Sequence, residues 1–319
     1  MAKLLITRPL PEAVLQAVDA GFDVSVRQET RPLAPAEMVD ALGRYDAILP
    51  TLGDPLSATV IGQASDIKCK ILANFGVGYN HIDVIAARTS GIAVTNTPGA
   101  VTDATADIAM TLILMTCRRA GEGERSVRAS AWEGWHPTQF LGFHVTGKTI
   151  GIIGMGRIGK AIAKRAGLGF DMNVVFYNRS KVDDAGVPAR QLDTLSEVCA
   201  TADIVVLAVP ATPETHHLMG ADLLRKMQPH SVLVNIARGD VVDEAALISA
   251  LQAGQISGAG LDVYEQEPIV PEALKAMENV TLLPHLGTAA LEVRVDMGLM
   301  AVDNLNAWID GKTLPNPVG

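Results

Sequence analysis

Cysteine is scarce in this chain: three occur among 319 residues, at Cys69, Cys117 and Cys199. Three cysteines are an odd number, and they lie far apart in the sequence. They therefore offer neither a disulfide framework nor the close ligand spacing of a zinc site. We therefore expect free thiols, a reducing compartment such as the cytoplasm, and no bound metal.

Long hydrophobic runs and an excess of positive charge are also missing. The longest apolar stretch, around Ile108–Met115, is far too short to span a bilayer. The N-terminal residues Lys3–Thr7 resemble a short strand rather than a signal peptide. Lysine and arginine total 26 against 35 acidic residues, a formal charge of −9. Nucleic acids and anionic membranes bind basic protein faces, so we expect neither as a partner. A small anionic ligand remains possible, because it needs only local backbone amides and one or two arginines.

Apolar residues, by contrast, make up 48% of the chain, although aromatic residues are only 4%. A chain of 319 residues exceeds one ordinary hydrophobic core and predicts two domains. Short apolar runs alternate with amphipathic segments from end to end, which is typical of parallel sheets with crossover helices. The expected fold class is therefore α/β.

The alternation falls into two series. In the first series we expect strands at Lys3–Thr7, Asp23–Val26, Asp46–Leu49 and Ile71–Asn74, and helices at Pro11–Ala20, Pro35–Leu42 and Leu56–Gly62. In the second series we expect six strands, as in a doubly wound sheet, at Thr149–Ile153, Asn173–Tyr177, Asp203–Val209, Ser231–Ile236, Gly260–Val263 and Val280–Leu283. The remaining segments are a long helix at Ala100–Arg119, an irregular stretch at Gly121–Phe143 and a last helix at Leu291–Ile309.

A glycine motif follows the first strand of the second series. The strand at Thr149–Ile153 continues into Gly-Met-Gly-Arg-Ile-Gly at 154–159 and then into a helical pattern. In a dinucleotide-binding loop the first glycine permits a tight turn, the second lets the backbone approach a pyrophosphate, and the third lets the helix pack against the strand. The free N–H groups at the helix start attract phosphate. An ordinary strand-to-helix turn is the alternative, but the flanking strand and helix favour a dinucleotide site.

The end of the next strand bears on the choice of cofactor. NAD-preferring enzymes place an Asp or Glu there, about 20 residues beyond the last glycine, to bind the ribose hydroxyls. This chain has Asn178, Arg179 and Ser180 instead. A neutral amide, an arginine and a hydroxyl suit a 2′-phosphate, which predicts NADP(H) as the preferred cofactor and NAD(H) as the second choice. The alternative is a solvated turn, with Asp183 or Asp184 binding the ribose.

Three charged residues follow three different strands of the second series: Arg238, Glu267 and His285. Ligands of open α/β sheets bind beyond the carboxyl ends of the strands, so these side chains are placed to converge. Taken singly, the arginine could be a helix cap or a surface ion pair, the glutamate a loop acid and the histidine a polar strand end. Their joint position downstream of the glycine motif favours a catalytic group.

Reduction of a keto acid by a nicotinamide needs these three residue types. Hydride addition leaves negative charge on the former carbonyl oxygen, and a protonated histidine can donate a proton to it. A carboxylate beside the histidine favours and orients the imidazolium. An arginine fork binds the substrate carboxylate and polarises the carbonyl. His285, Glu267 and Arg238 are the candidates for these roles.

Two neighbouring histidines, His216 and His217, raise the question of a metal site. Adjacent residues do not share a helix face, and no matching carboxylate or cysteine cluster is evident in the sequence. We expect a solvated or cofactor-side loop there.

Four ordered motifs resemble the D-2-hydroxyacid dehydrogenase family. They are the glycine motif at 154–159, Asn-Ile-Ala-Arg-Gly at 235–239, Asp-Val-Tyr-Glu-x-Glu-Pro at 262–268 and Pro-His-Leu-Gly-Thr at 284–288. The segments 74–83 and 135–142 are similar to the glyoxylate/hydroxypyruvate reductase branch of that family. The resemblance covers essentially the whole chain.

The resemblance implies a doubly wound Rossmann cofactor domain, residues 99–289, inserted into a smaller flavodoxin-like α/β substrate domain. That second domain would comprise residues 1–98 and a returning C-terminal helix, 290–319. The resemblance also implies a homodimer, catalysis by Arg238, Glu267 and His285, and binding of the substrate by Leu52, Val77, Gly78 and Arg238. Together with the motif and turn above, it assigns cofactor binding to Gly154, Gly156, Arg157, Ile158, Gly159, Asn178, Arg179, Ser180, Val209, Pro210, Thr215, Ile236, Ala237, Asp262 and Gly287.

The activity we expect is NADP(H)-dependent reduction of small 2-keto acids, such as glyoxylate and hydroxypyruvate, to glycolate and D-glycerate. One alternative is a dehydrogenase of another D-2-hydroxy acid, of the 2-ketogluconate or phosphoglycerate type, although the first domain shows no clear basic cluster for a phosphate. Another is a non-catalytic, dinucleotide-sensing module like the corepressors of this fold, in which an Arg/Glu/His set has no obvious use. A formate dehydrogenase is disfavoured, because that relative pairs its histidine with glutamine rather than with a residue like Glu267.

Overall fold

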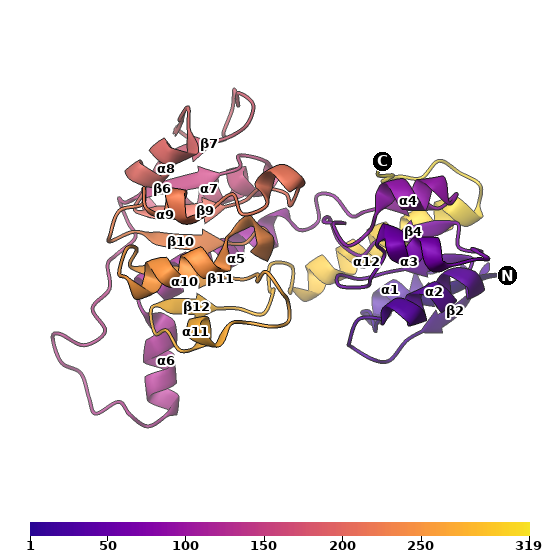
Figure 1. The fold of residues 1–319 in the computed structure, drawn as a ribbon, viewed down its shortest axis with the longest axis horizontal. Coiled ribbons are helices and arrows are strands. Elements are labelled where there is room, and N and C mark those ends of the chain that lie inside the picture. Colours follow the sequence, from indigo (N-terminus) through magenta and orange to yellow (C-terminus); the bar gives the residue numbers. More distant parts are fainter. The chain divides into compact units, whose positions relative to one another are not determined.

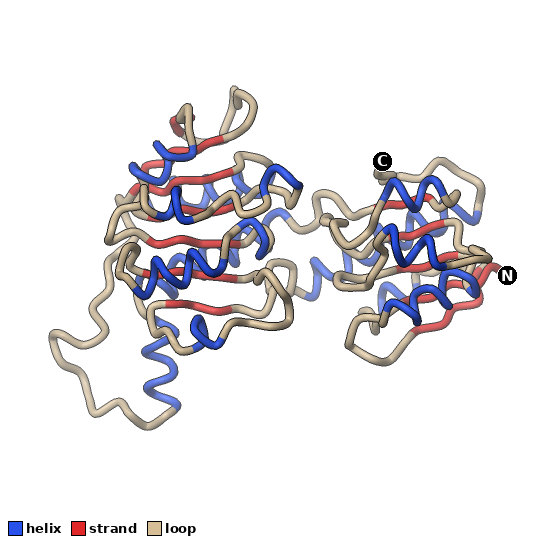
Figure 2. The backbone as a smooth tube through the Cα atoms, in the orientation of Figure 1, coloured by secondary structure: helices blue, strands red, loops and turns tan.

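The computed structural model describes residues 1–319, and the chain forms two compact units (Figure 1). Unit 1 contains Met1–Val101 and Ala289–Gly319, and unit 2 contains Thr102–Thr288. Each unit is built around one parallel sheet with helices on both of its faces (Figure 2). The predicted α/β class is therefore confirmed. None of the helices is both long and apolar enough to cross a membrane.

The sheet of unit 1 has the strand order β2-β1-β3-β4-β5, which is the doubly wound order of flavodoxin-like folds. The bounds are β1 Ala2–Ile6, β2 Phe22–Val26, β3 Ala47–Leu49, β4 Ile71–Ala73 and β5 Ala93–Thr95. The sequence located the first four strands. It missed β5, an edge strand of three residues with one large apolar side chain, Val94.

The helices of unit 1 start at recognisable local signals. Pro35 occupies the first position of its helix, where a missing N–H is harmless. The hydroxyl of Ser57 accepts a hydrogen bond from the N–H of Val60, and the carboxylate of Asp83 accepts one from the N–H of Ala86. The bounds are α1 Glu12–Gln16, α2 Pro35–Arg44, α3 Ala58–Gln63, α4 Val84–Thr89 and α12 Leu291–Ile309.

The C-terminal helix α12 completes unit 1. It covers the range that its apolar periodicity predicted, and it packs against α1 and β4. Gly298 permits the approach to α1, because a Cβ at this position would lie 2.3 Å from Cγ2 of Val14. The two ends of the chain are therefore joined in one hydrophobic core.

The sheet of unit 2 has seven parallel strands in the order β12-β11-β10-β9-β6-β7-β8. The bounds are β6 Thr149–Ile153, β7 Asn173–Tyr177, β8 Ala189–Gln191, β9 Ile204–Leu207, β10 Val232–Asn235, β11 Gly258–Leu261 and β12 Val280–Leu282. The chain builds outward from β6 first on one side and then on the other, so the topological switch point lies between β6 and β9. The sequence predicted six of these strands and missed β8, a short edge strand without an apolar pattern.

The helices of unit 2 correct one expectation. The bounds are α5 Thr102–Cys117, α6 Ala120–Arg128, α7 Arg157–Phe170, α8 Leu195–Thr201, α9 Ala221–Leu224, α10 Glu244–Gln252 and α11 Glu272–Lys275, with short 3₁₀ turns η1 Pro213–Thr215 and η2 Gly239–Val241. The stretch at Gly121–Phe143 was predicted to be irregular throughout, but α6 occupies its beginning. This helix is mostly polar and buries no residue, so apolar periodicity did not reveal it.

All three cysteines are free and buried. Burial raises the pKa of the thiols of Cys69, Cys117 and Cys199 to about 12. Thiols that stay protonated are poor nucleophiles and poor metal ligands. The cysteines therefore act as small core residues.

The contact between α12 and α1 gives a test of unit 1. Changing Gly298 to Ala should lower the free energy of unfolding by about 1–3 kcal/mol, the usual cost of overpacking, because the new methyl group would overlap Val14. The matched control is Gly62 in α3, where a Cβ meets no atom within 4 Å. Gly62→Ala should be neutral or stabilising by up to about 1 kcal/mol. Equal midpoints of chemical denaturation for the two variants would contradict the packing described.

Candidate active site

The three glycines in the loop after β6 meet three different steric requirements. Gly154 has φ +100°, and a Cβ there would lie 2.5 Å from the carbonyl oxygen of Ala208. A Cβ at Gly159 would lie 2.1 Å from the carbonyl oxygen of Gly154. A Cβ at Gly156 would meet nothing within 4 Å, so this glycine leaves room for a ligand rather than for protein atoms. A pyrophosphate-binding loop requires a tight turn, a helix packed close to the turn, and space for the phosphates to approach the backbone.

Helix α7 starts directly after this loop, at Arg157 and Ile158. No side chain caps its first turn, so its leading N–H groups remain for a phosphate. The loop also follows the strand at the switch point, next to the residues Val209 and Pro210 that follow β9. The residues present therefore fit a dinucleotide.

The turn after β7 is tied to the glycine loop. Oδ1 of Asn178 accepts a hydrogen bond from the N–H of Met155 at 3.2 Å, and Nδ2 of Asn178 donates to the carbonyl oxygen of Ser180 at 3.0 Å. The side chains of Arg179 and Ser180 are exposed. Asn178 thus shapes the turn, while its two neighbours remain accessible to a ligand.

The acids considered as alternative ribose ligands have partners of their own. Oδ1 of Asp184 accepts a hydrogen bond from the N–H of Gly186 at 2.7 Å. Asp183 forms an exposed ion pair with Lys181 at 3.4 Å. Asp184 therefore has a structural role in the turn.

The remaining cofactor candidates lie in loops that follow neighbouring strands. Oγ1 of Thr215 donates to the carbonyl oxygen of Pro210 at 2.7 Å, which closes the loop after β9. Ile236 and Ala237 follow β10, and the N–H of Ala237 donates to Oδ1 of Asn235 at 3.0 Å. The carboxyl edge of one sheet therefore carries every residue of unit 2 that the sequence nominated.

His285 and Glu267 form a pair. Nδ1 of His285 lies 2.8 Å from Oε2 of Glu267, and the N–H of Tyr264 donates to Oε1 of the same carboxylate at 3.0 Å. The two side chains are 26% and 30% exposed. Because Nδ1 faces the carboxylate, Nε2 is the ring nitrogen that remains for a ligand.

The carboxyl group of Glu267 is held in its charged form. Burial raises its pKa, but the hydrogen bond and charge of His285, the N–H of Tyr264 and the charge of Arg238 together outweigh burial. The net pKa of Glu267 lies below its ordinary value. A glutamate that is ionised at neutral pH favours the imidazolium form of its partner.

Arg238 lies between β10 and the turn η2. Its carbonyl oxygen accepts a hydrogen bond from Nδ2 of Asn235 at 2.8 Å, and its Nη1 donates to the carbonyl oxygen of Ala237 at 2.7 Å. Burial lowers the pKa of Arg238, and the charges of Glu267 and Asp240 oppose that shift. A guanidinium nevertheless remains charged at any physiological pH.

A glycine that the sequence did not single out brings the arginine and the glutamate together. A Cβ at Gly239 would lie 1.8 Å from the carbonyl carbon of Tyr264. Only glycine therefore lets the loop after β10 pack against the loop after β11. The signal was present in the sequence, as Arg-Gly after a strand, but a close approach of two loops has no local pattern.

Asp262 anchors the backbone that carries His285. Its carboxylate is 1% exposed and accepts hydrogen bonds from the N–H of Leu286 at 2.6 Å and of Gly287 at 2.8 Å. The N–H of His285 donates to the carbonyl oxygen of Asp262 at 2.9 Å, and His285 has φ +55°. Burial raises the pKa of Asp262 despite these backbone donors. Both carboxylate oxygens of this nominated cofactor ligand thus already bind the turn.

In unit 1, the substrate candidate Leu52 follows β3, and its carbonyl oxygen accepts a hydrogen bond from Nη1 of Arg8 at 2.7 Å. The candidates Val77 and Gly78 lie in the loop after β4. Nδ2 of Asn74 donates to the carbonyl oxygens of Gly76 and Gly78, both at 3.0 Å. None of these bonds uses the N–H of Val77 or Gly78, so both groups are available to an anion.

Arg294 is a cation that the sequence analysis left inside the last helix. Its guanidinium lies over the ring of Phe75, 5.9 Å from the centroid, beside the same loop of unit 1. Burial lowers the pKa of Arg294. Its position in the first turn of α12 gave no local signal, because the contact with Phe75 joins residues from opposite ends of the chain.

The comparisons with known proteins agree with this geometry. The family model of the NAD binding domain of D-isomer specific 2-hydroxyacid dehydrogenases matches residues 110–287. The chain belongs to the D-2-hydroxyacid dehydrogenase family. A glyoxylate reductase of Pyrococcus horikoshii is 42% identical over 99% of this chain and 95% of its own length. A glycerate dehydrogenase of Hyphomicrobium methylovorum is 38% identical over 97% of this chain and 96% of its own length.

A solved structure resembles this dehydrogenase in fold as well. It is an NADPH-dependent glyoxylate/hydroxypyruvate reductase of Sinorhizobium meliloti in complex with NADP and malonate. Its TM-score is 0.86 at 35% identity, covering 100% of this chain and 97% of the other. The dehydrogenase is therefore an enzyme with a nicotinamide dinucleotide cofactor and a Rossmann cofactor fold.

The role of Asp262 as an anchor can be tested in the dehydrogenase. Asp262→Asn replaces one acceptor by a donor that faces a backbone N–H, which should lower stability by about 1–3 kcal/mol. Displacement of the His285 turn by about 1 Å should lower kcat by roughly 100-fold, while KM changes little. Asp222→Asn, which alters an exposed ion pair, is the control and should change neither. Wild-type kcat in the Asp262 variant would contradict this role.

Proposed function

We propose that this dehydrogenase is an NADP(H)-dependent reductase of small 2-keto acids, with glyoxylate and hydroxypyruvate as substrates and His285 as proton donor. The observation that carries the proposal is the 2.8 Å contact between Nδ1 of His285 and Oε2 of Glu267, next to the charge of Arg238. The similarity to enzymes named for glyoxylate, hydroxypyruvate and glycerate supports the choice of substrate.

The reacting groups have distinct tasks in this proposal. The dinucleotide, when bound, supplies the hydride. Arg238 binds the substrate carboxylate through its planar fork. Nε2 of His285 donates the proton to the former carbonyl oxygen, so that the keto acid gains one hydride and one proton and becomes a 2-hydroxy acid. Glu267 holds the ring by Nδ1 and stabilises the imidazolium before the proton leaves.

Unit 1 contributes anion-binding groups. The N–H groups of Val77 and Gly78 suit a carboxylate, and Leu52 lies on the adjacent loop, since residues 51 and 75 pair with one another. Arg294 adds a positive charge beside the loop after β4. A small acid with one carboxylate fits this set, whereas a phosphorylated substrate would need a further cluster of basic residues.

The pair of Glu267 and His285 predicts a pH dependence. Reduction needs the imidazolium, so activity is present at low pH and is lost as the pH rises through the pKa of the proton donor. Glu267→Gln removes the charge that favours the imidazolium, so the basic limb of the kcat profile should move to lower pH. His285→Ala should lose roughly 10²- to 10⁴-fold in kcat and show no such limb. A limb that stays at its wild-type position in Glu267→Gln, with chemistry limiting the rate, means that Glu267 does not act through His285.

Arg179 predicts the choice of cofactor. A hydrogen bond from an arginine to a 2′-phosphate contributes about 1.5–3 kcal/mol to binding. Because Arg179 is exposed, solvent screening reduces this contribution towards the lower value. The value of kcat/KM with NADPH should therefore exceed that with NADH by roughly 10-fold. Arg179→Ala should remove most of this preference by weakening NADPH alone. Arg190→Ala, at another exposed arginine of the same unit, should leave the ratio unchanged. A wild-type preference for NADH, or equal losses with both cofactors, would favour the solvated-turn interpretation.

A further inference from the structure

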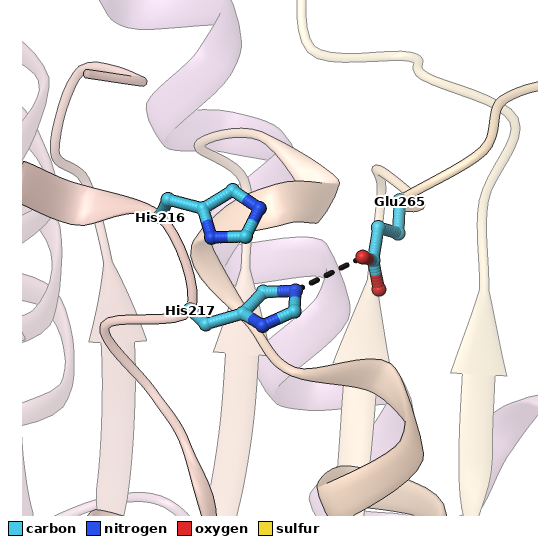
Figure 3. Close-up of side chains that lie close together, drawn as sticks. All are labelled: His216, His217 and Glu265. Carbon is cyan, nitrogen blue, oxygen red and sulfur yellow. Dashed lines mark hydrogen bonds and ion pairs between the residues drawn. The ribbon is translucent and has the colours of Figure 1, made fainter. Parts of the chain in front are cut away.

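Two histidines and a glutamate lie together at the carboxyl edge of the unit 2 sheet, outside the residues assigned above (Figure 3). Nε2 of His217 is 2.9 Å from Oε1 of Glu265, and the rings of His216 and His217 are stacked with centroids 4.0 Å apart. One potential ligand atom from each of the three side chains lies within 4.8 Å of the other two. Figure 3 shows a ring nitrogen of each histidine on the side of Glu265.

The backbone explains why two adjacent residues present their rings to one point. His216 has φ −61° and ψ 125°, which is extended, whereas His217 has φ +50°. The left-handed residue turns the chain, so the side chains do not alternate as they would in a strand. The sequence analysis considered only a helix face and found no carboxylate nearby. The structure does place a carboxylate beside His217, because Glu265 comes from a loop 48 residues further along.

Backbone hydrogen bonds fix both loops in place before any ligand arrives. The N–H of His217 donates to the carbonyl oxygen of Asp240 at 2.7 Å. The N–H of Glu265 donates to Oε1 of Glu244 at 2.9 Å. Since each loop has its own anchor, the three side chains need only rotate to bind a common ion.

We propose that His216, His217 and Glu265 form a binding site for a divalent transition metal of the zinc class. Two imidazoles and one carboxylate suit zinc, whereas calcium and magnesium prefer oxygen ligands alone. Zinc–ligand bonds of about 2.0–2.2 Å place tetrahedral ligand atoms about 3.3 Å apart. The 2.9 Å separation between His217 and Glu265 is close to that value, and the exposed His216 ring is free to close on the ion. Because His216 is exposed and the other two side chains are partly exposed, water can supply the fourth ligand.

Such an ion would join the loop after β9 to the loop after β11. Glu265 is two residues before Glu267 in the second of these loops. The proposed site is therefore a clamp on the edge that carries the catalytic residues, and it takes no part in the hydride or proton transfer.

The test is a titration of the purified, tag-free full chain, first stripped with EDTA and then freed of it, with ZnCl₂ in a calorimeter and with CoCl₂ in a spectrophotometer. We expect one saturable site per chain and the visible absorption of tetrahedral cobalt. His216→Ala and Glu265→Gln should each weaken zinc binding by at least about 10- to 100-fold, the loss that even outer-shell substitutions cause. Both changes affect accessible side chains, and circular dichroism and thermal melting would verify that the variants are folded.

The matched control is His230→Ala. Nε2 of His230 lies 2.7 Å from Oδ1 of Asp203, which gives a histidine–carboxylate pair without a second histidine. This variant should bind zinc as the wild type does. No saturable binding, or unchanged affinity in His216→Ala and Glu265→Gln, would overturn the proposal. Loss of binding in the control alone would move the site to His230 and would overturn it equally.

Discussion

The register of four parallel strands determines where the proposed reacting groups of this enzyme lie. Asn235 of β10 pairs with Leu207 of β9 and with Leu261 of β11, and Leu261 pairs with Leu282 of β12. The strands therefore end in line, and the loops that follow them leave from one edge. Arg238, Glu267 and His285 are each within a few residues of these strand ends. A slip of one residue in any strand would reverse its two faces and would displace the group that follows it.

The charges gathered at this edge depend on one another. Each of Arg238, Glu267 and Asp262 loses hydration on burial. For Glu267, the interactions with His285 and Arg238 outweigh the cost of burying the charged carboxylate. The pKa of Glu267 therefore falls below its ordinary value. The pKa of Asp262 rises, because burial outweighs its two backbone donors and the charge of His285, and the charge of Glu267 raises the pKa further. Two carboxylates a few residues apart thus serve different purposes, one holding the ring of His285 and the other a turn.

The sequence predicted the parts of the fold that burial controls. The central strands are continuous apolar runs, so Thr149–Ile153 and Asn173–Tyr177 were located to the residue. The edge strands β5 and β8 are short and gain little from burial, and the polar helix α6 gains nothing, so apolar patterning missed all three. These elements depend on contacts with neighbours rather than on a pattern of their own.

The residues of the candidate site were predictable from the sequence, but most of the contacts between distant segments were not. Residue type and position beyond a strand identified Arg238, Glu267 and His285. The pairing of His285 with Glu267 was inferred from chemistry, and the structure places the two 2.8 Å apart. By contrast, Gly239, Arg294 and the cluster at His217 depend on contacts between segments that are far apart in sequence. A local pattern carries no information about such contacts.

Buried polar residues at the strand ends make the functional loops rigid. Asp54 after β3, Asn74 after β4, Asn235 in β10 and Asp262 after β11 are each at most 1% exposed. Asp54 accepts hydrogen bonds from the N–H groups of Thr51 and Leu33, and the others bind their own loops as described. An unpaired buried polar group costs about 1–3 kcal/mol, so the hydrogen bonds of the Asp54 and Asp262 carboxylates and of Nδ2 of Asn74 and Asn235 favour the observed loop conformations.

This arrangement separates the residues that order a loop from the residues that meet a ligand. Val77, Gly78, Arg179 and His285 retain unpaired groups because their neighbours supply the structural hydrogen bonds. A reaction that requires reacting atoms to be aligned within a fraction of an ångström benefits from loops that are ordered before the ligand binds. In the proposed reaction the buried anchors therefore contribute without touching the substrate, and we expect their loss to affect kcat through the position of the groups they hold.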